Sequence, residues 1–384
     1  MRSLAYFKKG DIHFTDSIPS PKINHDHELI IDVSWCGICG TDLHEYLEGP
    51  IFMPPDGETH YLSGLELPLP MGHEMSGIVK EVGKGVTKVK PGDRVVIEAT
   101  TSCGDTDRWD HSKVKKGDKC SACSMGLPNC CTHGSFQGLG SVGGGFAEQV
   151  VVGEKHVVPI PDKLPLDVAA LVEPLSVAWH AARLAEFKEG STALVLGSGP
   201  IGLAMILCLK GMKAGKVIVS EPAKLRRELA EKLNVTVFNP SHNRGGDSAI
   251  EELKSYTKDN KGFDYTFDCS GVQDTFNAAI KTAGIQGHVV NVAIWGPKPV
   301  AFHPMDMTYG EKKLTGTMGY VTRDFEEVVD AIDKGDISIE ECKTLITGRV
   351  KLEEGMEKGF HELIDHKEGN VKVLLTPNNH GELP

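Results

Sequence analysis

The chain has 384 residues, of which 40% are hydrophobic, and carries a formal net charge of −12 with a pI near 5.7. Its length predicts two or three domains, and its acidic balance provides no basic surface for nucleic acid or an anionic bilayer. Because the sequence contains neither a signal-like apolar segment at its start nor a run of about 18 apolar residues, we expect a cytoplasmic protein without membrane or nucleic-acid partners.

The first part of the chain is rich in short β-like runs separated by glycine and proline. Examples are "ELIIDVSW", "MSGIVKEVG", "GDRVVIE" and "FAEQVVV", each bounded by turn residues. This pattern predicts a β-rich, barrel-like domain over residues 1–173. The tail of the chain ends in the apolar stretch "VKVLLTP", which we expect to return to this domain as a strand, so that residues 318–384 belong to it as well.

Within this first part, the stretch "CGICGTDLH" from Cys36 to His44 has several interpretations. A Cys-x-x-Cys pair can be a redox dithiol, half of a zinc ribbon, or one corner of a metal active site. The spacing alone does not distinguish them. In the redox interpretation Cys36 and Cys39 form a couple, and activity follows thiol redox state without stoichiometric metal.

A denser group of cysteines follows and ends in "CSACSMGLPNCC". Four thiolates are the ligand set of a closed, structural zinc site with tetrahedral geometry and no open position for chemistry. Cys130 and Cys131 compete for the fourth position, and the spacing leaves this open. A zinc-ribbon module that binds nucleic acid is disfavoured because the chain lacks a basic surface. The candidate ligands are Cys103, Cys120, Cys123 and Cys131.

From residue 174 to about 317, apolar strands alternate with helical stretches such as "LRRELAEKL" and "DTFNAAIKTA". Parallel strands need crossover helices, so this alternation predicts a doubly wound parallel sheet of the Rossmann type.

A dinucleotide signal opens this second domain. The G-x-G-x-x-G sequence follows the apolar strand "ALVL" and precedes a helix-length apolar segment, the context in which it binds a pyrophosphate at a helix N-terminus. Glu221 ends the next strand, 19 residues beyond Gly202, where a carboxylate binds the ribose hydroxyls and repels a 2′-phosphate, so NAD is favoured over NADP. Arg226 and Arg227 could flank the adenine or accept a phosphate. The residues predicted to bind NAD are Gly197, Gly199, Pro200, Ile201, Gly202, Glu221 and Arg226.

Taken together, these motifs resemble the zinc-containing medium-chain dehydrogenase/reductase family over essentially the whole chain. The matching stretches occur in the family's order and include "CGICGTDLHEY", "PLPMGHEMSGIV", "VKPGDRV", "GGFAEQVVV", "LVEPLSVAWHA", "VLGSGPIGL" and "DYTFDCSG". The resemblance implies a GroES-like catalytic domain over residues 1–173 and 318–384, and an NAD-binding Rossmann domain over residues 174–317. It also implies two zinc ions per chain, one catalytic and one structural, and a homodimer.

The resemblance assigns catalytic zinc ligands to Cys39, His73 and Glu173. Glu74 matches a glutamate that lies close to the metal in polyol-oxidising members, so it could replace water or Glu173 there. Asp42 matches the aspartate that orients the histidine ligand, a contact that fixes the imidazole tautomer. The hydroxyl and imidazole of the family's proton relay match Thr41 and His44.

The implied activity is NAD-dependent hydride transfer between a small secondary alcohol or vicinal diol, such as (R,R)-butane-2,3-diol, and its acetoin-type ketone. A sorbitol- or xylitol-type polyol dehydrogenase is the alternative, because the same ligand set suits that branch. Two insertions depart from the usual pattern: sixteen residues separate Cys103 from Cys120, and the interval from Cys39 to His73 carries "PIFMPPDGETHYLSGLELPLP". We expect this second insertion near the substrate mouth, with Ile51, Phe52 and Trp295 as candidate pocket walls.

Overall fold

The computed structural model describes residues 1–243, 246–366 and 369–377. Its contacts divide the chain into two compact units. The first comprises Met1–Glu173, Gly319–Val329 and Ile346–Pro384, and the second comprises Pro174–Met318 and Asp330–Leu345. Each unit is described separately below.

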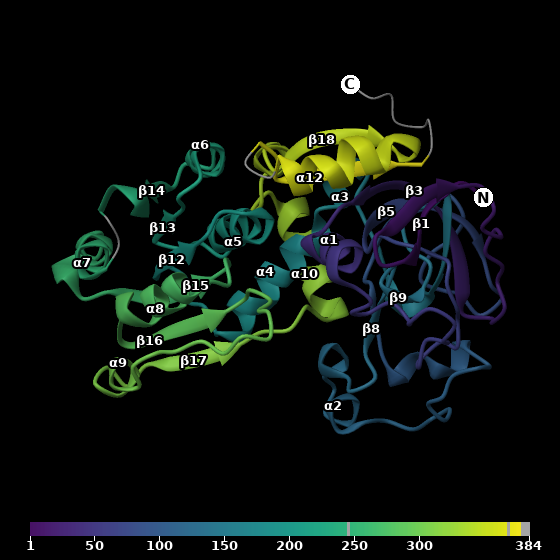
Figure 1. Cartoon of the computed structure of the whole chain (residues 1–384), viewed down its shortest axis with the longest axis horizontal. Helices are drawn as coiled ribbons and strands as arrows, with labels where there is room; N and C mark the ends of the chain where they lie inside the picture. The colour runs from purple at the N-terminus through teal and green to yellow at the C-terminus, as the bar shows by residue number, and fades with distance from the viewer. Residues whose placement is uncertain (244–245, 367–368, 378–384) are drawn as a thin grey trace. The chain divides into compact units, whose positions relative to one another are not determined.

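The first unit is built mainly from strands, as the sequence predicts (Figure 1). Its largest sheet has the order β11-β6-β5-β3-β19-β18, with β10 also paired to β3. Two smaller sheets have the orders β2-β1-β4 and β7-β8-β9. The strands are β1 (Ser3–Lys8), β2 (Asp11–Thr15), β3 (Glu28–Gly37), β4 (Leu69–Pro70), β5 (Glu74–Val82), β6 (Arg94–Ile97), β7 (Thr100–Thr101), β8 (Ser135–Gln137), β9 (Gly140–Val142), β10 (Gln149–Gly153), β11 (Val157–Pro159), β18 (Ile346–Lys351) and β19 (Lys372–Thr376).

The central strand of this sheet is β3, and its sequence explains its place. Its residues are almost all buried, as is typical of a strand with neighbours on both sides. The tail strand β19 pairs antiparallel with its end, with Leu375 opposite Cys36. The predicted return of the tail to the first domain is therefore confirmed, and it places residues from the two ends of the chain side by side near Cys39.

Short helices connect the strands of the first unit. They are α1 (Gly40–Glu48), α2 (Ser121–Ser124), α3 (Leu166–Ala169) and α12 (His361–Asp365). Helix α1 begins directly after β3, where Cys39 is its N-cap residue and Asp42 accepts the Cys39 backbone N–H at 2.8 Å. Because a capping carboxylate compensates free N–H groups of the first turn, this arrangement fixes the start of α1 beside the end of β3.

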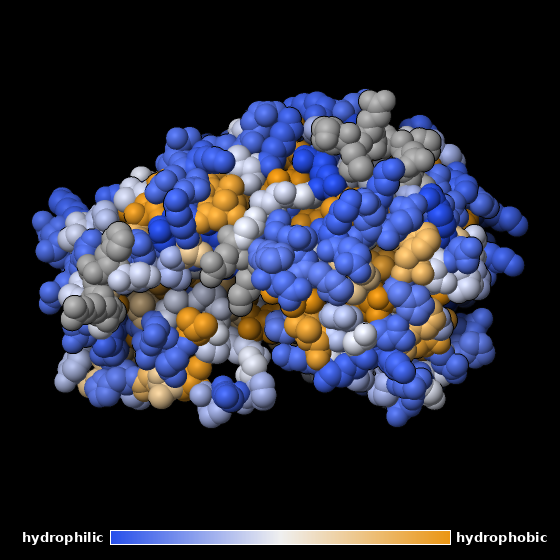
Figure 2. Space-filling model, turned by 45° about the horizontal axis from the view of Figure 1, so that its top comes forward, coloured by the Kyte–Doolittle hydropathy of each residue, from blue (hydrophilic) through white to orange (hydrophobic). Residues whose placement is uncertain are grey.

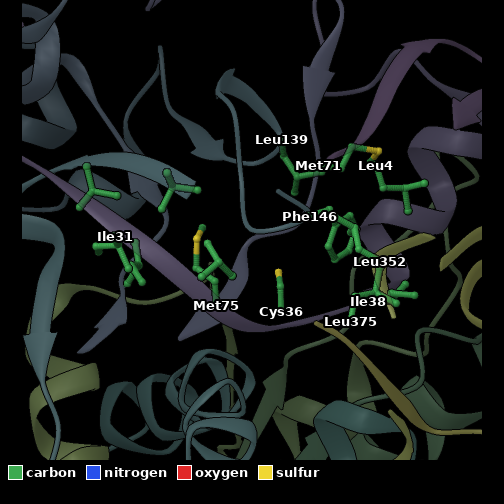
Figure 3. Packing of buried hydrophobic residues seen from close by; sticks show 14 of the residues in the cluster. Leu4, Ile31, Cys36, Ile38, Met71, Met75, Leu139, Phe146, Leu352 and Leu375 are labelled. Carbon is green, nitrogen blue, oxygen red and sulfur yellow. The ribbon is translucent and has the colours of Figure 1, made fainter. Parts of the chain in front are cut away.

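The apolar core of the first unit lies around Cys36. In Figure 3 its side chain lies between Met75 and Phe146, among Leu4, Ile38 and other buried residues. By contrast, hydrophilic residues cover most of the face seen in Figure 2, where hydrophobic residues appear as separate patches. Cys36 is therefore a packing residue of the core.

The second unit is a six-stranded parallel sheet with the order β14-β13-β12-β15-β16-β17 (Figure 1). This is the order of a doubly wound dinucleotide-binding sheet, in which the strand order reverses between the parallel neighbours β12 and β15. The predicted fold class is confirmed. The strands are β12 (Thr192–Leu196), β13 (Lys216–Ser220), β14 (Thr236–Phe238), β15 (Phe263–Asp268), β16 (Ala283–Asn291) and β17 (Lys313–Gly316).

The helices of the second unit include α5 (Pro200–Gly211), α6 (Lys224–Lys232), α7 (Asp247–Ser255), α8 (Gln273–Thr282), α9 (Met305–Thr308) and α11 (Ile339–Lys343). Helix α5 is apolar around its circumference and almost entirely buried, as expected of a helix enclosed by its own unit.

Two longer helices cross the division between the units, α4 (Val172–Leu184) and α10 (Thr322–Lys334). The sequence places all of residues 318–384 in the first domain, whereas Asp330–Leu345 packs with the second unit. The reason lies in contacts with α5: Lys210 forms an ion pair with Glu341, and buried Ile337 lies against Gly211. Within the described residues, no helix combines the length and apolar character needed to cross a bilayer.

Candidate functional site

A buried group of potential metal ligands lies where β3, β5 and α1 meet. The ligand atoms of Cys39, His73 and Glu74 all lie within 4.8 Å of one another. Cys39 is the N-cap of α1, His73 directly precedes β5, and Glu74 is the first residue of β5. The register explains the proximity, because Gly37 at the end of β3 is paired with Glu74.

Asp42 lies on the Nδ1 side of the His73 ring. The Asp42 Oδ1 atom lies 3.6 Å from His73 Nδ1, and both side chains are buried. Neither of these two atoms has a hydrogen-bond partner in the described structure. Burial would lower the pKa of His73, but the charges of Asp42 and Cys39 raise it well above its usual value. With Nδ1 facing Asp42, the free ring nitrogen is Nε2, which is the arrangement found for histidines that bind a metal.

A lysine from the tail balances the charge of this group. Lys372 Nζ lies 2.5 and 2.6 Å from the two carboxylate oxygens of Glu74 and 3.1 Å from the Ile38 carbonyl oxygen. Lys372 and Glu74 are almost fully buried, so the ion pair is shielded from water. The sequence analysis missed Lys372, although a lysine within the apolar strand "VKVLLT" is a signal of a buried charge partner.

Glu173 lies outside the group of three ligand residues, although it is buried nearby. Burial raises the pKa of Glu173 to about 7; the charge of His73 opposes this effect and that of Glu74 adds to it. Two buried carboxylates and a partly exposed thiol thus lie near one buried histidine. A soft thiolate, an imidazole and a carboxylate form a ligand set suited to zinc, and the donor set therefore fits a metal ion bound here.

The two predicted relay residues lie on α1 but are not joined directly. Thr41 Oγ1 lies 3.7 Å from Cys39 Sγ, at the edge of the ligand group. The His44 side chain is 62% exposed, with Nδ1 3.9 Å from a Glu48 carboxylate oxygen. Residues three apart are neighbours on a helix surface, so Thr41 and His44 share one face of α1. A proton path between them needs a bridging hydroxyl or water.

The four predicted structural cysteines form a second group of potential metal ligands. The sulfur atoms of Cys103, Cys120, Cys123 and Cys131 all lie within 4.8 Å of one another, whereas Cys130 is exposed and outside the group. Several backbone N–H groups point at these sulfurs, including those of Cys120 and Cys123. Backbone hydrogen bonds from Cys123 and Thr132 lower the pKa of Cys120 to about 5. Four converging sulfurs, with a thiolate favoured, fit a closed tetrahedral zinc site.

Cys36 does not pair with Cys39. Its side chain is completely buried in the core, and burial, together with the charges of Asp42 and Glu74, raises the pKa of Cys36 well above its usual value. All ten cysteines of the chain are free thiols. A dithiol couple needs an accessible thiolate, so the geometry does not favour the redox interpretation.

The glycine turn of the second unit has the backbone that its sequence predicts. Gly197 follows β12 with φ of +91°, and a Cβ there would lie 2.9 Å from the Ser270 side chain. A Cβ on Gly202 would lie 1.9 Å from the Gly197 carbonyl oxygen. The first glycine therefore permits the turn, and the last permits close contact between helix α5 and strand β12.

Gly199 and Pro200 complete this turn as the N-cap and first residue of α5, followed by Ile201. The space where a Gly199 Cβ would stand is open, with Arg226 Nη1 3.7 Å away. An anion at this helix N-terminus would therefore meet free backbone N–H groups and a guanidinium.

Glu221 lies just beyond β13, beside the glycine turn. Its carboxylate accepts the backbone N–H groups of Ser198 at 2.7 Å and Ala223 at 2.8 Å, which fixes its orientation. Arg227 donates to the carbonyl oxygens of Glu221 and Pro222. Of the two arginines that the sequence leaves open, Arg227 is thus tied to the backbone and Arg226 faces the turn.

Of the three candidate pocket walls, Phe52 is linked to the ligand group through the ring of Phe136. Its ring is perpendicular to that of Phe136, at a centroid distance of 5.7 Å, and the Phe136 ring lies 6.3 Å from that of His73. Ile51 is 52% exposed. Trp295 belongs to the second unit, where its indole N–H donates to Asn291 and its ring packs against Phe276.

A buried histidine between two carboxylates supports the first unit. His156 Nδ1 lies 2.8 Å from Glu98, and His156 Nε2 lies 2.6 Å from Asp105, two residues after Cys103. Burial would lower the pKa of His156, but Asp105 and Glu98 raise it to about 9. The resulting imidazolium ties β6 and the cysteine segment together. Sequence inspection missed this triad, because its members are dispersed and each is common alone.

Comparison with known proteins agrees with this geometry. Residues 25–162 match the alcohol dehydrogenase GroES-like domain, and residues 200–334 match the zinc-binding dehydrogenase domain. The chain is 62% identical to (R,R)-butanediol dehydrogenase of Saccharomyces cerevisiae, with full coverage of both chains. It is 51% identical to a probable diacetyl reductase [(R)-acetoin forming] of the same yeast, over 100% of this chain and 92% of the other.

A solved structure and a more distant relative complete the comparison. The crystal structure of 2R,3R-butanediol dehydrogenase from Bacillus subtilis superimposes with a TM-score of 0.85 at 35% identity, covering 98% of this chain and 99% of that one. Sorbitol dehydrogenase of Bacillus subtilis is 30% identical over 94% of each chain. The similarity to enzymes named for butanediol is therefore higher than that to this polyol dehydrogenase.

Proposed function

Because the chain belongs to the zinc-binding dehydrogenase family with an alcohol dehydrogenase GroES-like domain, we propose that it is an NAD-dependent (R,R)-butanediol dehydrogenase. The reaction interconverts (R,R)-butane-2,3-diol, and related vicinal diols or secondary alcohols, with acetoin-type ketones. The observation that carries the proposal is the convergence of Cys39, His73 and Glu74 beside Asp42, in a chain whose second unit bears the glycine turn.

Two cofactors would supply chemistry that the side chains lack. A zinc ion held by Cys39 and His73, with Glu173 or Glu74 as the third ligand, supplies Lewis acidity that lowers the pKa of an alcohol hydroxyl. NAD at the glycine turn of the second unit supplies the hydride acceptor. The four-cysteine group would hold a second, structural zinc ion, which makes two per chain.

Residues of the chain orient the histidine ligand, balance the buried charge and move the proton. Asp42 holds the His73 ring with Nε2 free for the metal, and Lys372 neutralises Glu74 so that the buried site does not accumulate excess negative charge. Thr41, beside Cys39, accepts the proton of the alcohol as the carbon loses its hydride. Thr41 passes a proton on through a bridging hydroxyl or water to His44, which lies at the surface on the same face of α1 and releases it to solvent.

NAD is proposed over NADP because Glu221 lies at the end of β13 with its carboxylate fixed by two backbone N–H groups. A negative charge at this point favours ribose hydroxyls and repels a 2′-phosphate. Arg226 is the residue that could weaken this preference, since it faces the same turn.

We also propose a homodimer in a reducing compartment such as the cytoplasm. Strand β17 is the last strand of the six-stranded sheet, and its Leu314 is half-exposed, so one edge of the sheet offers unpaired backbone groups to a second chain. The ten free thiols are consistent with a reducing environment.

The proposal is tested with purified protein by combining metal analysis with NAD reduction. We expect about two zinc ions per chain and NADH formation from (R,R)-butane-2,3-diol, with NADP much less effective. Removal of the accessible zinc with a chelator should abolish turnover and leave NAD binding intact. A metal-free protein that still oxidises the diol would contradict the proposal.

A further inference from the structure

The insertion between Cys39 and His73 is a loop without regular secondary structure over residues 50–68, but contacts fix it at both ends. At its start, the Glu45 carboxylate accepts three consecutive backbone N–H groups. The Ile51 nitrogen lies 3.0 and 3.1 Å from the two Glu45 carboxylate oxygens. The Phe52 nitrogen lies closer still to one of these oxygens, and the Met53 nitrogen lies 3.3 Å from it. Glu45 is completely buried, so one side chain of α1 holds the first residues of the loop.

Loss of this contact would leave polar groups without hydrogen bonds on both sides, on Glu45 and on the loop. Glu45 lies in the last turn of α1, where the helix carbonyls make a buried negative charge unfavourable unless donors compensate it. The loop supplies those donors, and the three N–H groups have no other partner among the printed contacts of the described residues. An uncharged glutamine would satisfy them less well, because its amide presents one acceptor oxygen and an NH2 group that only donates.

The second half of the loop rests on the four-cysteine segment. Leu62 is completely buried in one cluster with Cys103, Trp109 and Val114. The Tyr61 carbonyl oxygen accepts the Lys113 backbone N–H at 3.1 Å, and the Tyr61 ring stacks on that of His133 at 5.2 Å. The two insertions that distinguish this sequence therefore pack against each other, and the cysteine segment supports the loop.

At the first anchor of the loop, Phe52 forms an aromatic surface with Phe136 of β8 beside the ligand group. Phe52 and Phe136 are partly buried, and Phe136 lies between Phe52 and the ring of His73. A hydroxyl placed against such a surface loses its hydrogen bonds with water, whereas a methyl group gains from the burial. The surface therefore favours an alkyl group next to the reacting carbon over the hydroxyl-bearing carbon of a polyol.

We propose that the fixed loop of residues 50–68, together with Phe136 of β8, forms a wall that selects short-chain diols, with Phe52 and Phe136 as the specificity-determining residues and Glu45 as the positioning residue. This inference rests on the proposed function, because it assumes that the alcohol binds at Cys39 and His73. It narrows the substrate class to vicinal diols with small alkyl ends.

The test compares Glu45→Gln and Phe52→Ser with the control Glu58→Gln. Glu58 is an exposed carboxylate of the same loop whose side chain has none of these contacts. For Glu45→Gln we expect at least tenfold faster amide hydrogen exchange at residues 51–53 and at least a tenfold rise in KM for butane-2,3-diol. Zinc content and KM for NAD should stay unchanged, and Glu58→Gln should behave as the unmodified protein.

Phe52→Ser tests the wall even if Glu45→Gln fails to fold, because Phe52 is only partly buried. We expect the ratio of kcat/KM for butane-2,3-diol to that for sorbitol to fall by about 10- to 200-fold, the range for one apolar contact in a pocket. An unchanged ratio, or unchanged exchange and KM in Glu45→Gln, would overturn the wall while the proposed function stands. An unmodified protein that fails to oxidise butane-2,3-diol would instead overturn the proposed function and the selectivity that rests on it. The hydrogen-exchange measurement tests the contact between Glu45 and residues 51–53 without any substrate.

Discussion

The buried triad of His156, Glu98 and Asp105 makes a quantitative prediction about stability. The two carboxylates raise the pKa of His156 to about 9, compared with an ordinary value of about 6.5. That difference corresponds to about 3 kcal/mol of stability. Because the folded pKa is raised, this contribution is fully present below about pH 6.5 and is lost as the pH rises toward about 9.

The perturbation is His156→Gln, which keeps hydrogen-bonding capacity but removes the positive charge. At pH 6.5 we expect a loss of about 3 kcal/mol, because both carboxylates lose their buried cation. In a unit of roughly 200 residues, this corresponds to a decrease in Tm of about 6–12 °C. At pH 9.5 the difference between the two proteins should shrink, since the imidazole of the unmodified protein is then largely neutral.

The assay is thermal unfolding of both proteins at several pH values, with His13→Gln as the control. His13 also pairs with an aspartate, Asp11, at 2.8 Å, but its side chain is half-exposed, so its removal should change Tm little at any pH. A difference between His156→Gln and the unmodified protein that stays constant from pH 6.5 to 9.5 would refute the reasoning, as would a difference below 1 °C at pH 6.5.

Three further predictions concern the candidate active site. Cys39→Ser should abolish turnover and reduce the zinc content from two ions per chain to one, while NAD binding stays intact. The control Cys130→Ser should retain both ions. A Cys39→Ser enzyme with near-normal kcat would exclude Cys39 from the ligand set. His44→Gln should lose about 10- to 1000-fold in kcat and recover at raised pH, and an unchanged pH profile would exclude His44 from the relay. Lys372→Met should destabilise the protein by about 3–5 kcal/mol in urea unfolding, because it leaves Glu74 buried without its cation. The double variant Lys372→Met/Glu74→Gln should regain most of that loss, and equal stability of the single variant and the unmodified protein would contradict the role of the pair.

Much of the geometry of the candidate coenzyme site could be predicted because its signals are local. The glycines, Pro200 and Glu221 lie within one strand–helix–strand stretch, and their roles follow from backbone geometry at fixed spacing. The structure adds the positive φ of Gly197 and separates the roles of Arg226 and Arg227. The four-cysteine group was similarly predictable, because thiols at short spacing have few other uses in a reduced chain.

The candidate metal site was predictable only in part, because its members come from distant segments. The resemblance assigned ligand roles to Cys39, His73 and Glu173 and placed Glu74 close to the metal, but it did not indicate that Glu173 lies outside the group of three or that the tail contributes Lys372. Glu45 and His156 were missed for the same reason. Their partners are backbone N–H groups or carboxylates brought close by tertiary packing, and an isolated glutamate or histidine in the sequence is usually solvated. The assignment of Asp330–Leu345 likewise depends on packing against α5.

The proposed function depends on which alcohol the protein prefers, and steady-state values of kcat/KM measure this preference directly. We compare kcat/KM for (R,R)-, meso- and (S,S)-butane-2,3-diol with that for sorbitol, each with NAD as the coenzyme. We expect the highest kcat/KM for (R,R)-butane-2,3-diol and a value for sorbitol lower by at least two orders of magnitude, in line with the effect of a polar group against an apolar wall. A preference for sorbitol would contradict it and would favour a polyol dehydrogenase.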